Sequence, residues 1–389
     1  MKNLLSKEKL VLLHSIRGFA ALIVVIAHVK FPFWSGGVEY LKHFPRSEWN
    51  LWDYFLFGID MFTSNATVMV IIFFVLSGFF IAYSFENNKW TVKQFYTNRL
   101  IRIYTPYIAS MILAVVLFKL AMYINPDLFN SVNPRQYNQD IIRASQNLNT
   151  KNFLYSLFFI PNPQYIAYNY PYWSLLVEAM FYIIAPFFIK KSKTFLFITF
   201  SFFILGRFFD LTAIPFMPRY VANFLTIHSI YFAMGYFMFW LLFDYKIQEK
   251  IKRINVWCFN LLAAAILLSS LYGGFFLPTN ISYLLGGMFA SVMIYRMIVY
   301  PVRITFISRF FISMGKISYT MYLIHVPIFI FLYSILVKFS GQEVFFSRIY
   351  WIPAIIAVLV SYPFYWLVEH QSLKLIKWYK SKTLSKRIH

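Results

Sequence analysis

Apolar segments long enough to cross a membrane recur from one end of the 389-residue sequence to the other. A transmembrane helix needs about 20 mostly apolar residues, with a range of about 17 to 25. The sequence therefore predicts an all-α fold, a polytopic membrane helical bundle. Windows of the required length predict about ten spans, near residues 10–29, 65–85, 103–124, 174–190, 194–210, 225–243, 256–276, 281–299, 317–338 and 349–368.

The composition agrees with this fold class. Apolar residues make up 60% of the chain and charged residues 13%, with a mean hydropathy of +0.61, which is far from the average of soluble domains. The net charge of +22 could indicate nucleic acid, but no basic recognition helix or aromatic-basic platform occurs, so we predict no nucleic-acid partner. The single cysteine, Cys258, excludes an intramolecular disulfide, and no HExxH-type spacing occurs, so we predict no metal.

The loop charges predict the orientation. If the N-terminus is cytoplasmic, basic clusters such as residues 89–102 and 190–193 lie in inner segments, and the outer loops hold few lysines and arginines. An even number of spans then makes both termini cytoplasmic. We divide the chain into a transmembrane domain, residues 1–370, and a basic cytoplasmic tail, residues 371–389.

Three further segments have surface character. Residues 30–64 and 125–172 form long outer segments that contain aromatic, amide and carboxylate side chains. Such side chains suit the apolar faces and hydroxyls of sugars, although an aromatic belt at the membrane surface has the same composition. Within the second segment, residues 153–160 predict an interfacial helix. Residues 301–315 predict an amphipathic helix on the inner surface.

The first span carries ionisable residues that hydrocarbon disfavours: His14, Arg17 and His28. Insertion scales assign a charged residue at the membrane centre a cost of about 2.5–3.5 kcal/mol, so such residues usually face protein or water. Arg17 and His28 are eleven residues apart, which puts them on one helix face about 16 Å apart along the axis. The alternative is a signal-anchor helix with incidental polar residues.

Glu178, in the fourth span, is the natural partner for His28. His28 lies at the outer end of its span and Glu178 about one turn inside the outer end of its own, so the two are at similar depth. A histidine oriented by a carboxylate is the arrangement that general-base catalysis requires. The alternative is a structural glutamate paired with Arg17 or Arg207.

Two further motifs contain candidate binding residues. Arg99 and Arg102 start the third span, and their guanidinium groups match phosphate oxygens, although positive-inside topology also explains them. His325 lies near the middle of the ninth span, where Pro327 frees a backbone carbonyl; it is either a satisfied interior histidine or a functional one. We assign Tyr172, Trp173 and His325 as candidate substrate-binding residues.

Five segments, taken in chain order, resemble the acyltransferase-3 family of bacterial integral-membrane O-acyltransferases. The chain departs from the family pattern in two places: Glu178-Ala-Met stands where the family often has Glu-Glu-Gln, and Thr105 precedes Pro106. The resemblance covers nearly the whole chain, from the first span to the ninth. The segments are Arg17-Gly-Phe-Ala-Ala with His28, Phe73-Phe-Val-Leu-Ser-Gly-Phe-Phe-Ile81, Arg99-Leu-Ile-Arg-Ile-Tyr, Tyr172-Trp-Ser-Leu-Leu-Val-Glu178 and Ile317-Ser-Tyr-Thr-Met-Tyr-Leu-Ile-His-Val-Pro327.

The resemblance implies a reaction and roles for individual residues. Family members transfer an acyl group, commonly acetyl from cytoplasmic acetyl-CoA, to a hydroxyl of an extracytoplasmic glycan. By motif, His28 is the catalytic histidine, Arg17 its companion, and Arg99 and Arg102 engage the phosphates of CoA. Glu178 would orient His28, and the sequence leaves direct and covalent acyl transfer equally open.

We therefore predict a multi-pass O-acetyltransferase of the bacterial inner membrane. Its acceptor would be a lipid-linked or surface glycan, such as lipopolysaccharide O-antigen or an exopolysaccharide. Some family members carry an SGNH hydrolase-like domain after the last span, and this sequence has none, so we expect it to act alone or with a separate partner. Two alternatives remain: a glycan or acyl-carrier transporter without chemistry, and a membrane scaffold for glycan synthesis.

Overall fold

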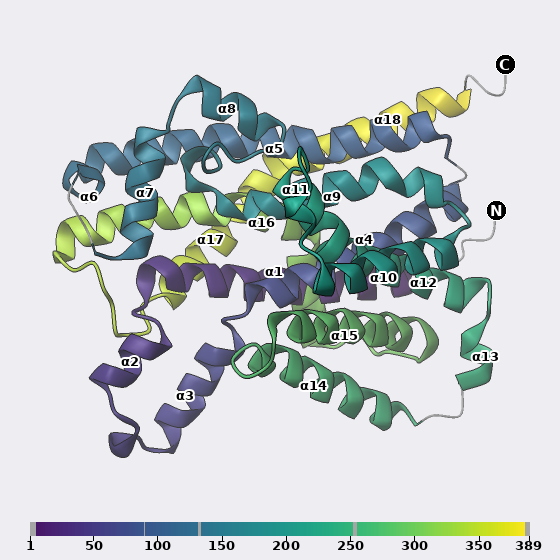
Figure 1. Cartoon of the computed structure of the whole chain (residues 1–389), viewed down its shortest axis with the longest axis horizontal. Helices are drawn as coiled ribbons and strands as arrows, with labels where there is room; N and C mark the ends of the chain where they lie inside the picture. Colours follow the sequence, from purple (N-terminus) through teal and green to yellow (C-terminus); the bar gives the residue numbers. More distant parts are fainter. Residues whose placement is uncertain (1–4, 89, 131–133, 252–254, 386–389) are drawn as a thin grey trace. The chain divides into compact units, whose positions relative to one another are not determined.

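A computed structural model of the protein describes residues 5–88, 90–130, 134–251 and 255–385. Within these ranges every regular element is helical (Figure 1). The chain forms two compact units, each built from three stretches of sequence. Unit 1 comprises residues 1–24, 61–92 and 177–316, and unit 2 comprises residues 25–60, 93–176 and 317–389.

Helices α1, α3, α9 and α16 contain residues of both units. They are α1 (Lys7–Phe33), α3 (Leu51–Phe62), α9 (Trp173–Ile184) and α16 (Phe306–Ser340). The other helices of unit 1 are α4 (Ala66–Asn88), α10 (Ser192–Phe208), α11 (Arg219–Asn223), α12 (Ser229–Phe243), α13 (Ile247–Ile251), α14 (Val256–Gly273) and α15 (Thr279–Val299). The other helices of unit 2 are α2 (Gly37–His43), α5 (Val92–Ile124), α6 (Pro126–Asn130), α7 (Gln136–Gln146), α8 (Thr150–Leu157), α17 (Trp351–Phe364) and α18 (His370–Ser385).

Nine helical segments of the described residues are long and apolar enough to cross a membrane. They correspond to nine of the ten predicted spans. The remaining prediction, 194–210, falls on α10, which has 17 residues and so lies at the lower end of the length that a membrane requires. The all-helical, polytopic fold is therefore confirmed, whereas the cytoplasmic location of the termini stays a prediction.

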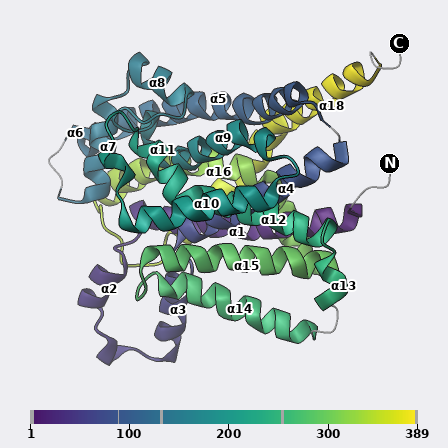
Figure 2. The ribbon, with the colours of Figure 1, turned by 45° about the vertical axis from the view of Figure 1, so that its right-hand side comes forward.

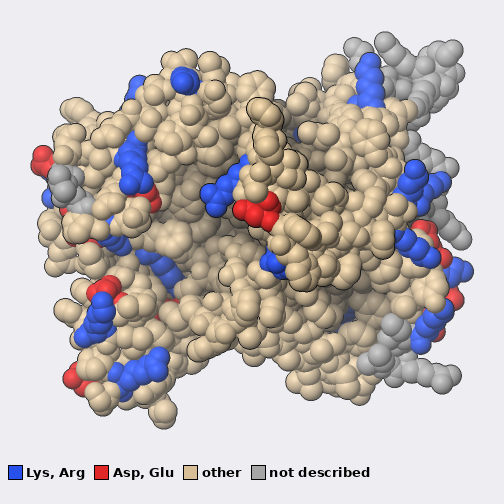
Figure 3. All heavy atoms as spheres, viewed as in Figure 1, with Lys and Arg blue, Asp and Glu red and all other residues tan. Residues whose placement is uncertain are grey.

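Large apolar side chains cover much of the outside of unit 1. On α10, Phe197 and Phe208 are 70% and 77% exposed, and on α14 Leu261 is 71% exposed. Soluble proteins rarely expose such patches, but side chains of this kind suit lipid tails. On the face drawn in Figure 3, most of the described surface carries neither basic nor acidic side chains.

Two glycine contacts set a close helix crossing in unit 1, between α4 and α12. A Cβ atom on Gly78 of α4 would lie 2.0 Å from the Phe232 carbonyl oxygen of α12, and one on Gly235 of α12 would lie 1.8 Å from the Val75 oxygen of α4. The pair therefore requires glycine on both sides, as is typical of close crossings between membrane helices. Helix α15 lies against both helices of this pair, and α14 runs beside α15 (Figure 2).

The structure changes the interpretation of three predicted segments. Residues 301–305 are not helical, and residues 306–315 begin the long helix α16. The helix predicted at 301–315 therefore starts five residues later and continues into the ninth span, and its location on the inner surface stays a prediction. A Cβ atom on Gly18 of α1 would lie 1.9 Å from the Phe311 oxygen, which shows that this part of α16 is packed. Residues 153–157 of the helix predicted at 153–160 belong to α8, which ends at Leu157, and its location at the membrane interface stays a prediction. Most of the predicted tail forms α18.

Candidate active site

Helix α1 contains both Arg17 and His28 in one unbroken run, Lys7–Phe33. The helical geometry on which the prediction depended is therefore present: the two residues share a face, about 16 Å apart along the axis. In unit 1, the guanidinium carbon of Arg17 lies 5.9 Å from the centre of the Phe73 ring, within the range of a cation–π contact. Phe73 belongs to the second of the five family-like segments.

In unit 2, His28 is hydrogen bonded to His325 of α16. The His28 Nδ1 and His325 Nε2 atoms are 2.8 Å apart, and the two rings are stacked with centroids 5.1 Å apart. His28 is 7% exposed and His325 is fully buried. The two residues are 297 positions apart in the sequence, and the sequence analysis did not predict that they would pair.

The hydrogen bonds of this pair decide where the protons lie. His325 Nδ1 is 2.8 Å from the carbonyl oxygen of Met321, and a carbonyl can only accept, so Nδ1 carries the hydrogen. In the neutral ring Nε2 of His325 is then the acceptor, and His28 Nδ1 donates to it. The lone pair of His28 consequently lies on Nε2, which has no hydrogen-bond partner among the described residues. His28 is thus arranged to accept a proton at Nε2.

A proline and an asparagine fix the helix turn that carries His325. Pro327 has no N–H, so the carbonyl of Leu323, four residues earlier, loses its helical hydrogen bond. The side-chain amide of Asn169 donates to that oxygen at a distance of 2.9 Å, and Asn169 is fully buried. The prediction that Pro327 frees a carbonyl is confirmed, and the Asn169 amide donates the hydrogen bond that this carbonyl lacks.

Aromatic rings surround the pair. The Tyr170 ring meets the His28 ring edge-on with centroids 5.0 Å apart, and Phe329 packs in the same way against His325 at 5.7 Å. Phe31, one helix turn after His28, stacks on it at 5.8 Å and is half exposed. These rings leave the imidazole of His28 little access to water.

The predicted substrate residues lie in different environments. Tyr172 is fully buried, and its hydroxyl forms a 2.8 Å hydrogen bond with Ser110 of α5. In this structure its side chain therefore contacts protein and not solvent. Trp173 is half-buried at the start of α9. Their roles in substrate binding stay predictions, as does that of His325, which contacts His28.

Glu178 is held by hydroxyl groups of unit 1. Its Oε1 accepts hydrogen bonds from Ser77 Oγ at 3.0 Å and from the Tyr182 hydroxyl. Ser77 and Glu178 come from two different family-like segments, so unit 1 brings these two motifs together. In the part of the chain that the structure describes, no ion pair joins Glu178 to Arg17 or Arg207. That Glu178 orients His28 stays a prediction.

Basic side chains gather around the start of α5 in unit 2. Arg99 and Arg102 are three residues apart, so both lie on one side of the helix. Their charges act on the ammonium group of Lys380, which comes from α18. Three cations that repel one another favour an anion among them, and guanidinium groups match phosphate oxygens in particular. The sequence analysis had placed Lys380 in a tail.

A comparison with family sequence models gives one match, to an acyltransferase domain of the acyltransferase-3 family, over residues 12–370. The chain belongs to the acyltransferase-3 family. It is therefore a multi-pass membrane acyltransferase, as the resemblance implied. The matched residues include all of the predicted site residues. No curated protein and no solved structure matches the chain at a significant level.

Two clusters around charged side chains of this acyltransferase could not be found from its sequence. In the first, Asp60 of α3 is fully buried and its Oδ2 is 2.9 Å from Arg348 Nη2, while the hydroxyl of Tyr350 donates to Oδ1. Lys30, two residues after His28, donates to the carbonyl oxygen of Asp60. Burial and the hydrogen bond to Asp60 raise the pKa of Tyr350, which keeps its hydroxyl protonated as a donor.

The second cluster holds the end of α1. The Arg135 guanidinium donates to the carbonyl oxygens of Phe31, Pro32 and Trp34. The last carbonyls of a helix lack backbone partners and carry partial negative charge, so a cation there is favourable. Arg135 thus fixes the helix end that carries His28. Among the described residues, no group of three or more metal-ligating side chains lies together.

Proposed function

We propose that this membrane acyltransferase transfers an acetyl group from cytoplasmic acetyl-CoA to a hydroxyl of a cell-surface glycan, lipopolysaccharide O-antigen or an exopolysaccharide, in the bacterial inner membrane. The observation that carries the proposal is the hydrogen-bond chain from Met321 through His325 to His28. This chain leaves a lone pair on His28 Nε2, in a site from which aromatic rings exclude most water. An acyl transfer to a hydroxyl requires such a base.

The proposed direct step uses His28 as a general base. His28 Nε2 takes the proton of the acceptor hydroxyl as its oxygen bonds to the thioester carbonyl carbon. The carbon–sulfur bond then breaks, and the CoA thiolate leaves with the proton that His28 held. While His28 is protonated, His325 Nε2 accepts the hydrogen bond from its Nδ1 and stabilises the imidazolium ring.

The basic residues would bind the donor. Arg99 and Arg102 match the family's Arg-x-x-Arg pair, and the nearby charge of Lys380 supports an anion-binding role for this end of α5. Coenzyme A carries several phosphate charges, and its pantetheine arm is long and thin. We propose that the arm follows the face of α1 that carries Arg17 and His28, which would bring the thioester toward His28.

The proposal is tested in cells by the ester-linked acetyl content of the surface glycan. We expect deletion of the gene and the His28→Ala variant to abolish the acetyl ester, whereas Cys258→Ala, at an exposed position, should leave it unchanged. A scaffold would tolerate His28→Ala. A transporter of acyl carriers or glycans would lose other glycan features as well as the ester. Unchanged acetylation in both the deletion strain and the His28→Ala variant would refute the enzyme proposal for that glycan.

Direct and covalent transfer are separated by a single-turnover experiment. Purified protein is mixed with labelled acetyl-CoA and no acceptor, and the protein is then analysed for label. Covalent transfer through His28 Nε2 predicts a labelled wild-type protein and an unlabelled His28→Ala variant. Direct transfer predicts no label in either protein.

A further inference from the structure

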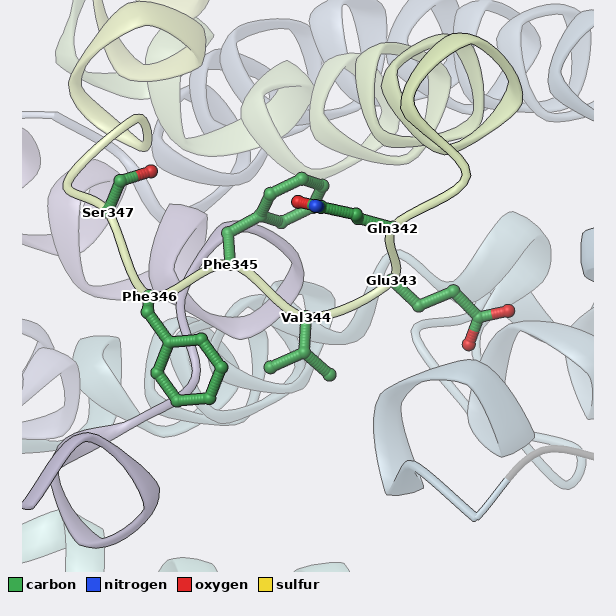
Figure 4. Close-up of a pocket in the computed structure, with 6 residues that line it drawn as sticks. All are labelled: Gln342, Glu343, Val344, Phe345, Phe346 and Ser347. Carbon is green, nitrogen blue, oxygen red and sulfur yellow. The ribbon is translucent and has the colours of Figure 1, made fainter. Parts of the chain in front are cut away.

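A cavity of about 580 Å³ lies at the loop that joins α16 to α17 (Figure 4). Its wall consists of six consecutive residues, from Gln342 to Ser347. The volume lies within the range of about 300–1,000 Å³ that is usual for small-molecule sites. The loop starts at Gly341, whose φ of +66° lets the chain turn away from the end of α16.

Hydrogen bonds hold the loop in place. The Glu343 carbonyl oxygen accepts from Tyr333 at 3.0 Å and from the Arg135 guanidinium. The Phe345 carbonyl oxygen accepts from the backbone N–H of Ser35 at 2.8 Å. Because these bonds fix the backbone before any ligand arrives, binding at this loop would require little further ordering.

The same guanidinium joins the loop to the His28 site. Arg135 donates to the carbonyl oxygen of Phe31 as well as to that of Glu343, so both oxygens contact one guanidinium group. The Phe31 ring stacks on His28. The cavity wall is thus only a few side chains away from the proposed base.

Aromatic rings form a continuous row between the two places. Neighbouring ring centroids in this row are 5.0, 5.2, 5.9, 5.5 and 6.5 Å apart. An aromatic belt at a membrane surface would face lipid, but in this row Tyr137, Tyr333 and Phe345 are buried. The row consists of His28, Tyr170, Tyr168, Tyr137, Tyr333 and Phe345.

The polar groups beside the rings favour a neutral ligand rich in hydroxyls. The Glu343 carboxylate accepts from Asn138 at 2.7 Å, and that of Asp140 accepts from the Tyr168 hydroxyl at 3.0 Å. Gln342 is an exposed amide of the wall. Carboxylates repel phosphates, whereas carboxylate and amide groups bind hydroxyls, and ring faces pack on the C–H faces of sugars.

We propose that the cavity at residues 342–347 is an acceptor subsite, which binds the sugar unit next to the one that receives the acyl group. This inference rests on the proposed function, because it assumes a glycan acceptor. The exposed side chain of Gln342 and the free edge of the half-buried Phe346 ring, which stacks on His43, would contact that neighbouring unit. Glu343 would accept a hydrogen bond from one of its hydroxyls. The subsite therefore selects an oligosaccharide over a single sugar.

The test uses the purified full-length protein and three reactions. De-esterified surface glycan from the host cells is cut into oligosaccharides and into single sugars, and each is offered with labelled acetyl-CoA. Hydrolysis of acetyl-CoA by water, without acceptor, is the third reaction. The variants are Gln342→Ala and Phe346→Ala. Gln371→Ala, at an exposed position of α18, and Phe188→Ala, whose half-buried ring stacks on Phe195 as that of Phe346 stacks on His43, are the matched controls.

We expect each subsite variant to raise the KM for the oligosaccharide about tenfold, with unchanged kcat, unchanged transfer to the single sugar and unchanged hydrolysis. Unchanged hydrolysis also shows that the variant is folded. A wild-type KM for the oligosaccharide in both variants, or equal losses in all three reactions, would overturn the subsite. If His28→Ala is inactive while the subsite variants behave as wild type, only the subsite fails. If the wild-type protein acylates neither acceptor, the proposed function fails as well.

Discussion

At the scale of single residues, the sequence suggests a carboxylate, Glu178, as the partner of His28, whereas in unit 2 His28 is hydrogen bonded to His325. A carboxylate next to a catalytic histidine both orients the ring and stabilises its cation. A neutral histidine orients the ring by the same hydrogen bond but carries no charge. In unit 2, the Met321 carbonyl fixes the proton on His325 Nδ1, so the orienting function depends on that backbone contact.

The first prediction concerns His325 as a positioning residue. We expect His325→Leu to lower kcat about 100-fold or more while the KM for acetyl-CoA stays near the wild-type value, because the His28 ring loses its acceptor. In His325→Gln the amide oxygen can replace Nε2 as the acceptor, so activity should recover to within about tenfold of the wild type. Steady-state kinetics on both variants check this. Equal losses in the two variants would show that His325 acts only through packing.

A second prediction concerns the buried carboxylate of Asp60. Asp60→Asn removes the anion that pairs with Arg348, and breaking a buried ion pair typically costs about 3–5 kcal/mol. We expect a large fall in Tm in detergent. The exposed pair Lys42–Glu39 provides the control, because Glu39→Gln should leave the Tm unchanged. Similar Tm values for the two variants would contradict a stabilising role for Asp60.

The sequence predicted some of these residues and not others for a physical reason. An ionisable residue in an apolar helix, such as Arg17 or His28, is conspicuous because hydrocarbon disfavours it. Arg135 lies in a polar segment, where charged residues are common. Asp60 lies in a short apolar helix of an outer segment, and only tertiary contacts give these two residues a role. Asn169 stands beside the Tyr-Pro-Tyr-Trp run, but nothing in the sequence indicates that its amide reaches Leu323.

At the scale of the elements, α16 depends on a side chain from another segment to complete its backbone hydrogen bonds. The oxygen of Leu323, freed by Pro327, is buried and would cost about 1–3 kcal/mol if left without a donor. The amide of Asn169 supplies that donor. The turn that carries His325 is therefore held by residues before α9, and not by α16 alone.

The third prediction is a double-mutant cycle on this contact. Asn169→Leu alone should lower stability by about 1–3 kcal/mol, because the Leu323 oxygen loses its donor. Pro327→Ala restores the N–H that Leu323 lacks, so in that background Asn169→Leu should have a much smaller effect. Thermal unfolding of the four proteins in detergent measures the coupling. Additive effects would show that Asn169 stabilises the protein in some other way.

At the scale of the whole molecule, hydropathy predicts nine or ten spans. Whether the number is odd or even depends on one short helix, α10. Nine segments of the described residues qualify clearly, and an odd number would put the two termini on opposite sides of the membrane. The basic residues at both ends of the chain favour the same side. Hydropathy could not decide this point, because α10 has 17 residues, at the lower end of the spanning length.

The last prediction therefore tests whether α10 crosses the membrane. Lys191 and Ala213 are exposed residues on either side of α10, and Cys258 is the chain's single cysteine, so a Cys258→Ala background gives a protein without thiols. Lysines precede α10 and few basic residues follow it, which predicts that Lys191 lies on the cytoplasmic side. We expect a membrane-impermeant maleimide to label Ala213→Cys in intact spheroplasts, and Lys191→Cys only after permeabilisation. Labelling of both residues under the same condition would mean that α10 does not cross, and the two termini would then lie on opposite sides.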